Sequence, residues 1–399
     1  MIAYALIMAF YCFGDTTVGY IVPVIMTEHL KSPALMGLVF AFSSLVGLAI
    51  DLLLPQLLPK KNFRFFVPAT FVTALLFPLS FLVLPASLWT FLIAMAIWGV
   101  YYEFARFSHF SFIHQTLKPA QHDLGWGILQ AFQSFTLLIA PIFAIYLLEK
   151  QENLPFIMAI VYLGIGLIGY FFLKGAFLKK KMQVATEDTQ HPAARLHEVR
   201  VWFVLLKKIW PLCLFLLGLT LLDSAFWVIG ALLSEELQGG GFLGSFVITA
   251  YVLPSIFVSL IARRVSKPLG KKRTAFVTAL VGSLILIIGG LFIHGSMFVL
   301  VILAASLFLS VSYPEMYAVF EDFVARLEHN SNDMIGLEGS SISIGYVLGP
   351  ILAGSLSTIV GYQNTLVAVA VLFLITTTIA AIKVPRKIHL PQKELLNID

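Results

Sequence analysis

Two aspartates, Asp15 and Asp223, lie inside long apolar stretches of the chain, where a charged side chain is costly to keep. Each has an aromatic residue one helical turn away, Tyr11 before Asp15 and Trp227 after Asp223. A carboxylate beside aromatic rings suits an organic cation, through charge and cation–π attraction. Removed from water, the same group can also exchange a proton near neutral pH. The alternative is a structural role, in which each aspartate bonds to neighbouring hydroxyl groups (Thr16, Thr17 and Ser224).

Glu103 and Arg106 are three residues apart in another apolar stretch, so they share one face of a helix and can pair. A paired couple is cheaper to bury than either charge alone. Two interpretations stay open. The pair is structural, or it takes part in proton coupling, in which case protonation of Glu103 frees Arg106.

Four further polar residues in apolar stretches are candidates for a binding site. Glu315 follows Pro314, so it is either a coupling site at a hinge or an inner-end carboxylate grouped with Glu321 and Asp322. Glu338 is near the start of its predicted helix, where the helix dipole favours an acid, and this structural role is the preferred one. Gln130 and Gln133 are uncharged candidates for a cavity wall.

The composition determines which elements can position these residues. Of the 399 residues, 59% are hydrophobic and only 12% are charged, and the mean hydropathy is +0.93. Soluble proteins carry roughly 25% charged residues. The sequence therefore excludes a soluble enzyme, a disordered chain and a fibrous repeat, and it indicates an integral membrane protein.

A helix that crosses a bilayer needs about 20 mainly apolar residues. The chain contains twelve such stretches, and helices are expected because lipid cannot satisfy exposed backbone polar groups. The predicted spans are residues 2–27, 34–58, 63–84, 88–112, 124–148, 154–178, 209–233, 242–262, 274–293, 297–320, 334–359 and 362–382.

Basic residues predict the orientation of these spans. With the N-terminus in the cytoplasm, 23 Lys and Arg fall on the inner side and only two, Lys31 and Lys150, on the outer side. Positive charge gathers on the cytoplasmic side of membrane proteins. Both termini are therefore predicted to be cytoplasmic, and the net charge of +5 reflects topology and no nucleic-acid partner.

The two halves of the chain repeat each other in sequence, with an offset of 208 to 212 residues. The landmarks of this repeat are Asp15 with Asp223, Lys60-Lys61 with Lys271-Lys272, Glu103 with Glu315, and Ala140-Pro141 with Gly349-Pro350. Six spans return the chain to its starting side, so the halves are parallel repeats.

The repeat sets the predicted domain organisation. We expect six-helix bundles at 1–178 and 209–384, a cytoplasmic linker at 179–208 and a cytoplasmic tail at 385–399. Apolar residues recur every three or four positions in the second part of the linker, among basic ones. This pattern indicates either an amphipathic helix on the inner leaflet or the basic lead-in to the seventh span.

These features together resemble the major facilitator superfamily, and its drug/proton antiporters in particular. Gly47-Leu-Ala-Ile-Asp51 followed by Lys60-Lys61 is similar to the family's loop between spans two and three, which implies a cytoplasmic gate at Asp51, Lys60 and Lys61. Gly345 to Gly354 resembles the family's antiporter motif, here in span eleven. The resemblance implies that Asp15 and Asp223 face each other across a central cavity, around which the two halves rock.

The charges inside the spans favour one class of substrate. Asp15, Glu103, Asp223 and Glu315 outnumber Arg106, which disfavours anions. The predicted function is proton-coupled secondary transport, exporting cationic or amphipathic organic molecules. The alternative is proton-coupled uptake, or flipping, of a neutral polar solute or a lipid-like molecule. We expect a monomer in the plasma (inner) membrane whose partners are a small-molecule substrate, protons and the lipid bilayer.

Several motifs are rejected as functional signals. Two Gly-x-Gly-x-x-Gly patterns, beginning at Gly164 and Gly239, lack the strand and helix that a dinucleotide site requires. His109 and His114 are five residues apart, the wrong spacing for two ligands on one helix face. The sequence contains no P-loop and no catalytic triad signature. We therefore predict no enzyme activity, no cofactor and no metal.

Overall fold

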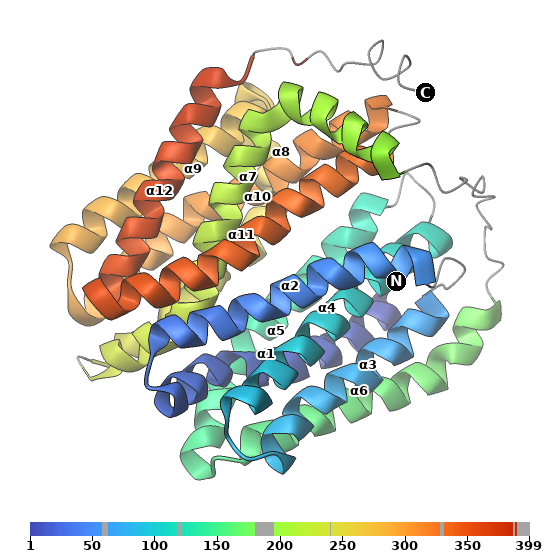
Figure 1. Ribbon diagram of the computed structural model, residues 1–399, viewed down its shortest axis with the longest axis vertical. Helices are drawn as coiled ribbons and strands as arrows, with labels where there is room; N and C mark the ends of the chain where they lie inside the picture. The colour runs from blue at the N-terminus through green and yellow to red at the C-terminus, as the bar shows by residue number, and fades with distance from the viewer. Residues whose placement is uncertain are drawn as a thin grey trace. The chain divides into compact units, whose positions relative to one another are not determined.

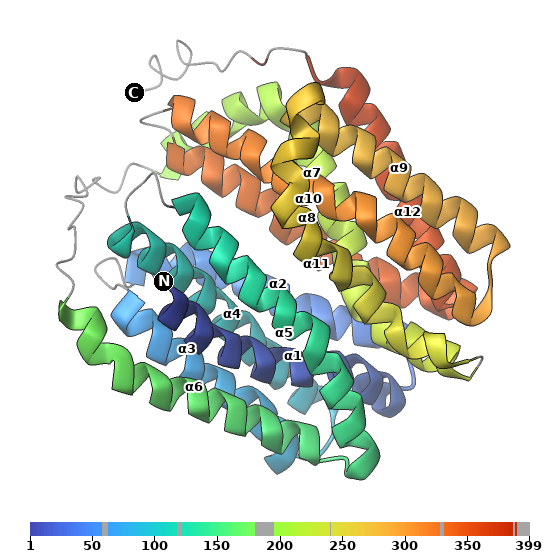
Figure 2. The same ribbon diagram turned by 180° about the vertical axis from the view of Figure 1, so that it is seen from behind.

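The computed structural model describes residues 1–57, 63–117, 122–179, 195–239, 241–327, 331–385 and 388. Within these ranges the chain is helical almost throughout (Figures 1 and 2). The first six helices are α1 (Ile2–Leu30), α2 (Pro33–Leu57), α3 (Phe63–Val83), α4 (Leu88–Thr116), α5 (His122–Lys150) and α6 (Leu154–Lys179).

The next six helices are α7 (Arg195–Gln238), α8 (Val247–Leu269), α9 (Lys271–Phe292), α10 (Phe298–Leu327), α11 (Ser331–Val360) and α12 (Tyr362–Lys383). Two short 3₁₀ turns, η2 (Phe242–Phe246) and η3 (Gly295–Met297), precede α8 and α10. The prediction of an all-α membrane protein with twelve helices is confirmed. Eleven helices are long and apolar enough to cross a membrane, and in α8 the described apolar part is shorter, Phe242–Phe257 with its preceding turn.

The seventh helix begins earlier than its predicted span. It runs without a break from Arg195 to Gln238, whereas the predicted span starts near residue 209. The basic, apolar-patterned segment before the span is therefore the beginning of the same helix. In Figure 1 these first turns lie at an angle to the rest of α7, and Pro211 lies inside the helix, where a proline removes a backbone hydrogen bond.

The chain forms two compact units, Met1–Ala185 and Thr186–Asp399, which are described one at a time. In the first, α1 packs against α5 and α6, both α2 and α3 pack against α4, and α3 packs against α6. In the second, α7 packs against α11 and α12, both α8 and α9 pack against α10, and α9 packs against α12. Each contact of the first unit has its counterpart six helices later, so the two units share one packing scheme.

Glycines let the helices that carry the predicted site approach closely. On α11, a Cβ at Gly345 would overlap the side chain of Thr220, and one at Gly349 would overlap that of Ser224, both on α7. The Ser224 hydroxyl donates to the backbone carbonyl of Gly345 at 3.1 Å. The glycine motif of span eleven is thus a close contact within the second unit, and it brings the residue after Gly345 next to Asp223.

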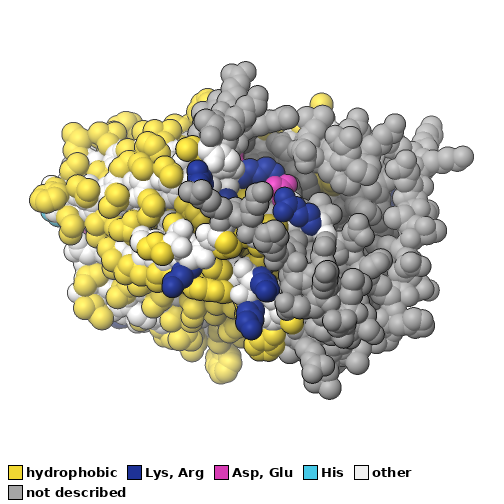
Figure 3. All heavy atoms as spheres, turned by 90° about the horizontal axis from the view of Figure 1, so that it is seen from above, with side chains coloured by type: hydrophobic (Ala, Val, Ile, Leu, Met, Phe, Trp, Pro, Cys, Tyr) yellow, Lys and Arg dark blue, Asp and Glu magenta, His cyan; other side chains and the backbone are white. Residues whose placement is uncertain are grey.

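The outward faces of the helices are apolar, as lipid contact requires. Large hydrophobic side chains are exposed on them, among them Phe172, Ile359 and Ile382. On the face shown in Figure 3, Lys and Arg side chains gather near an acidic side chain, and hydrophobic side chains cover the described surface around them. One exposed ion pair, between Lys271 of α9 and Asp322 of α10 at 2.9 Å, joins helix ends in the second unit.

Candidate functional site

In the first unit, Asp15 lies midway along α1 and is partly buried. Its Oδ1 accepts a hydrogen bond of 2.6 Å from the hydroxyl of Tyr101 on α4. Trp98, also on α4, lies near the same carboxylate. The rings of Tyr11 and Tyr101 meet edge to face at 6.0 Å, and Phe77 of α3 packs against both Trp98 and Tyr101. The carboxylate therefore lies in an aromatic setting, with the sequence-predicted Tyr11 as part of it.

In the second unit, Asp223 lies about two thirds of the way along α7, near the middle of its apolar part Phe203–Gln238, and is also partly buried. The hydroxyl of Tyr251 on α8 donates to its Oδ1, and that of Tyr346 on α11 donates to its Oδ2, each at 2.5 Å. Phe226 stacks on the Tyr251 ring at 3.8 Å, and Trp227 meets that ring edge to face at 6.3 Å. Three helices thus converge on one carboxylate.

Sequence reasoning missed the tyrosines that bind the two aspartates. Tyr101 has a repeat counterpart, Tyr313, at the same offset as Glu103 and Glu315, and this recurrence could have drawn attention to it. Tyr313 itself donates to the backbone carbonyl of Leu219, at 3.1 Å, one turn before Asp223. Tyr251 and Tyr346 belong to no motif that sets them apart, and only the packing of α8 and α11 on α7 reveals their role.

The hydroxyls proposed as structural partners of the aspartates bond elsewhere. Thr17 donates to the carbonyl of Phe13, and Ser224 donates to those of Leu221 and Gly345. The partners of the two carboxylates are instead phenols from other helices. Such bonds between helices make each aspartate a junction of its bundle.

Glu103 and Arg106 form an ion pair along α4, with Arg106 Nε 2.7 Å from Glu103 Oε2. The Glu103 side chain is 11% exposed and that of Arg106 is 38% exposed. Gly47 of α2 packs directly against the Glu103 carboxylate, and the Arg106 guanidinium lies 5.8 Å from the ring centre of Phe107. The acid is held inside the bundle, while the base reaches toward its surface.

The remaining acidic candidates lie on two helices of the second unit. Glu315 is buried in α10, two residues after Tyr313, and Glu338 is partly buried on α11, two turns before Tyr346. Asp322, proposed as a neighbour of Glu315, binds Lys271. The described interactions of Asp223 do not include either glutamate.

Gln133 belongs to a polar network within the first unit. Its Nε2 is 3.3 Å from Nε2 of the buried His109 on α4, whose Nδ1 is 3.0 Å from the hydroxyl of Tyr4 on α1. The same hydroxyl is 2.8 Å from that of Ser108. Gln133 therefore ties α5 to α4, a role that its sequence position did not indicate.

Some predicted residues cannot be placed. Lys60 and Lys61 lie outside the described residues, and so do the side chains of Asp51 and Gln130. The proposed gate at Asp51, Lys60 and Lys61 therefore stays a prediction. Among the residues that are described, no cluster of three His, Cys, Asp or Glu could hold a metal ion.

Comparison with known proteins identifies the family. The model of the Major Facilitator Superfamily matches residues 4–223 and again residues 212–396, which together cover nearly the whole chain. The chain belongs to the Major Facilitator Superfamily. It is accordingly a membrane transporter. The second match lies within the second unit, whereas the first spans most of the first unit and extends into α7.

Solved structures of superfamily transporters share this fold. A POT family transporter in complex with 5-aminolevulinic acid aligns over 96% of both chains, with a TM-score of 0.72 and 13% identity. A bacterial homologue of the human lysosomal transporter Spinster, in an inward-facing and occupied conformation, aligns over 95% of both, with a TM-score of 0.70 and 13% identity. At this identity the likeness shows the fold alone. No curated protein sequence matches the chain.

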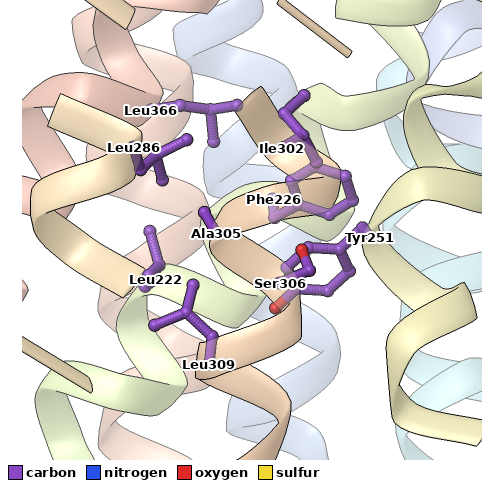
Figure 4. Close-up of a pocket in the computed structure, with 9 residues that line it drawn as sticks. All are labelled: Leu222, Phe226, Tyr251, Leu286, Ile302, Ala305, Ser306, Leu309 and Leu366. Atoms are coloured by element: carbon purple, nitrogen blue, oxygen red, sulfur yellow. The ribbon is translucent and has the colours of Figure 1, made fainter. Parts of the chain in front are cut away.

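The second bundle of this superfamily member contains a small apolar cavity beside the Asp223 cluster (Figure 4). It measures about 10 Å³, and it is lined by Leu222, Phe226, Tyr251, Leu286, Ile302, Ala305, Ser306, Leu309 and Leu366. Sites for organic ligands occupy roughly 300–1,000 Å³. The cavity is therefore a packing void, and Tyr251 both lines it and donates to Asp223.

Proposed function

We propose that this transporter couples the movement of protons to the export of cationic or amphipathic organic molecules by alternating access. Asp15 and Asp223 are the carboxylates that bind substrate and proton. The observation that carries the proposal is the repeated cluster: each unit holds a partly buried aspartate near the middle of the apolar part of its first helix, bonded to tyrosine and surrounded by aromatic rings.

Charge supports a cationic substrate. The described partners of Asp15 and Asp223 are Tyr and Trp side chains, and no Lys or Arg is among them. A carboxylate that keeps its negative charge in an apolar setting attracts a cation strongly, because the local dielectric constant is low. Aromatic faces add cation–π attraction of about 0.5–2 kcal/mol for each well-placed ring.

The ion pair on α4 supports a role for protons. Protonation of Glu103 removes the charge that holds Arg106, since the two side chains are joined at 2.7 Å. The released guanidinium is already partly exposed, so it can find another partner without crossing the bundle. In this proposal the pair assists coupling, and Glu315 is an additional acid for the same purpose.

Topology and assembly complete the proposal. The 23 basic residues on one side of the spans support a topology with both termini in the cytoplasm and the protein in the plasma (inner) membrane. Each bundle contains its own aspartate cluster, so a single chain carries both sites. A monomer is therefore sufficient for transport.

The test is transport of a lipophilic cation by the purified protein in proteoliposomes under an imposed pH gradient. We expect Asp15→Asn and Asp223→Asn each to reduce pH-driven transport at least tenfold, because each removes a carboxylate from its site. Glu149→Gln, which removes an exposed acid at the end of α5, is the matched control and should transport like the unmodified protein. Unchanged pH-driven transport in both aspartate variants would disprove the proposal.

The second candidate is uptake or flipping of a neutral polar solute or lipid-like molecule. The network of Tyr4, Ser108, His109 and Gln133 favours it, since amide, hydroxyl and imidazole groups recognise neutral polar groups. Thermal stability separates the two. If neutral peptides or lipids raise the melting temperature and organic cations do not, the second candidate replaces the first.

A further inference from the structure

The two aspartates differ in how their oxygens are occupied. Asp223 receives one phenol on each oxygen, from Tyr251 and Tyr346. Asp15 receives a phenol on Oδ1 from Tyr101, and the described hydrogen bonds include no second hydroxyl on this carboxylate. The clusters are related by the repeat, but they are not copies.

Sequence confirms that the difference is built in. By the offsets of the repeat, the first-unit counterpart of Tyr251 is Phe40 and that of Tyr346 is Leu137, and neither carries a hydroxyl. Phe40 is buried and packs against Trp98 at 5.3 Å. The second unit therefore has two phenol side chains at positions where the first unit has the apolar side chains of Phe40 and Leu137.

The phenols on Asp223 are held in place by their own packing. Tyr251 stacks on Phe226, and Tyr346 follows Gly345, which lies in close contact with α7. A substrate that binds Asp223 directly must therefore displace a packed ring. A proton needs no such space.

We propose that the two carboxylates have different ligands: Asp15 binds the cationic group of the substrate, and Asp223 takes the proton. Tyr251 and Tyr346 are positioning residues that reserve Asp223 for the proton. This division rests on the proposed function and assigns a separate task to each of its two aspartates.

The chemistry of a phenol allows the proton to enter without dismantling the cluster. A tyrosine hydroxyl both donates and accepts hydrogen bonds. When a proton adds to one oxygen of Asp223, a new O–H bond forms there and the carboxylate loses its charge. The proton comes from a hydronium ion in water, whose O–H bond breaks as the new one forms. The phenol on that oxygen turns its own hydrogen away and accepts a hydrogen bond from the new O–H, so the proton is held and no bond within the protein breaks. Return of the proton to water reverses each step.

The elements packed around Asp223 carry other ionisable groups, and none of those that the structure describes hydrogen-bonds to it. Helix α10 carries Tyr313, Tyr317, Asp322 and Arg326, and α12 carries Tyr362 and Lys383 at its two ends. The hydroxyl of Tyr313 donates to the carbonyl of Leu219 and not to Asp223. The η2 turn carries none, and the acids of α10 and α11 considered above are Glu315 and Glu338. The two phenols that touch the carboxylate therefore control its proton most directly.

Asp15 offers a different environment. Its single phenol comes from one side, and the rings of Tyr11, Trp98 and Tyr101 surround it without stacking face to face on one another. Such ring faces and edges suit a bulky organic cation, which needs both a charge and an apolar contact. The first unit thus offers a carboxylate that a cation can reach, whereas in the second unit phenols occupy both oxygens of the carboxylate.

The test uses the full-length protein and the cation tetraphenylphosphonium as probe, with binding and proton release measured on the same sample. We expect Asp15→Asn to weaken binding of the cation at least tenfold. We expect Asp223→Asn to leave binding within about threefold and to abolish the pH dependence of transport. Equal loss of cation binding in the two variants, or the reverse assignment, overturns the division of tasks.

Tyrosine variants test whether the phenols control the proton on Asp223, because a purely structural role would leave the pH midpoint of transport unchanged. Tyr251→Phe and Tyr346→Phe each remove a hydrogen bond to the charged form of Asp223, so the pH midpoint of transport should rise by about one unit. Tyr101→Phe should instead raise the concentration of cation needed for half-maximal transport. Tyr313→Phe is the matched control, since its hydroxyl binds a backbone carbonyl, and both quantities should stay unchanged.

The outcomes separate the two proposals. If neither aspartate variant alters cation binding or proton coupling, the proposed function fails. If both matter but the pH midpoint is the same in Tyr251→Phe, Tyr346→Phe and Tyr313→Phe, only the division of tasks fails. Because the phenylalanine variants keep every ring, they preserve the packing and answer the question even if Asp223→Asn does not fold.

Discussion

The two bundles use one helix arrangement to hold two different carboxylate sites. In the first, one helix besides α1 reaches Asp15, through Tyr101. In the second, two helices besides α7 reach Asp223, through Tyr251 and Tyr346. The comparison teaches that a repeat preserves the backbone framework, while a few side chains on the facing helices give each half its own chemistry.

The bundles also differ in what surrounds these sites. The first contains the ion pair of Glu103 with Arg106, whereas the residue that corresponds to Arg106 in the second is Ala318. The first bundle also contains the polar network of Tyr4, Ser108 and Gln133 around His109. In the second bundle the corresponding residues are apolar: Leu212, Phe320 and Ile342. Polar contacts in the first half thus stand where the second has apolar packing.

The largest effect is expected where the second bundle is packed most tightly. Gly349→Val places side-chain atoms where the Ser224 side chain lies, so α11 must move away from α7. Overpacking of this kind costs about 1–3 kcal/mol, and Tyr346 moves away with its helix. We expect transport to fall at least tenfold and the melting temperature to drop. Gly164→Ala on α6, where an added Cβ meets nothing within 4 Å, is the control.

The comparison would be broken if Gly349→Val transported normally. In that case transport would not require the close approach of α11 to α7, and the hydrogen bonds that join α8 and α11 to Asp223 would have no role in transport. The Gly164→Ala variant should retain both transport and stability.

A smaller effect should separate the two glutamates that the repeat relates. Glu103→Gln removes the charge partner of Arg106, so we expect proton-driven transport to fall about tenfold, in line with the 1.5–3 kcal/mol of a charged hydrogen bond. Adding Arg106→Gln should restore part of the activity, because the unpaired cation is gone. Transport rates under a pH gradient for the two single variants and the double variant give the coupling energy between Glu103 and Arg106. In the second bundle, Ala318 stands at the position that corresponds to Arg106. A substitution at Ala318 should therefore not restore activity to Glu315→Gln.

The smallest effect is expected in the network of the first bundle. Tyr4→Phe leaves Ser108 and His109 without the hydroxyl that both contact, which costs about 1–3 kcal/mol of stability. Thermal unfolding in detergent measures this loss. Cation transport should be nearly unchanged, because Tyr4 lies about three turns along α1 from Asp15. A large loss of transport at unchanged stability would instead place this network in the substrate path.

Much of the fold could be predicted, because the length and apolar composition of a segment identify it as a membrane helix. Most of the twelve predicted spans match the helices to within a few residues, and the largest difference is the start of α7 at Arg195. A hydrophobicity threshold marks where a helix enters the apolar region, but a helix can continue beyond it among basic residues such as Lys207 and Lys208. The span was therefore predicted, and the full helix was not.

The candidate site could be predicted only in part. Asp15 and Asp223 stand out because a charge inside an apolar stretch is rare, and Glu103 with Arg106 because their spacing places them on one helix face. Tyr251 and Tyr346 do not stand out, since a tyrosine in an apolar helix is common. Gln133 was recognised as polar, but its partner His109 lies on another helix, and sequence spacing carries no information across helices.

The sequence by itself determined the membrane class, the twelve helices, their two-fold repeat and the acids that lie inside the apolar stretches, because each depends on local composition or on an offset along the chain. Only the tertiary structure decided which groups hold those acids. Gly345 and Gly349 bring α11 onto α7, and that contact lets Tyr346 meet Asp223, whereas Asp15 meets Tyr101 of α4. The physical reason is that a hydrogen bond requires two atoms within about 3 Å, and helix packing sets that distance.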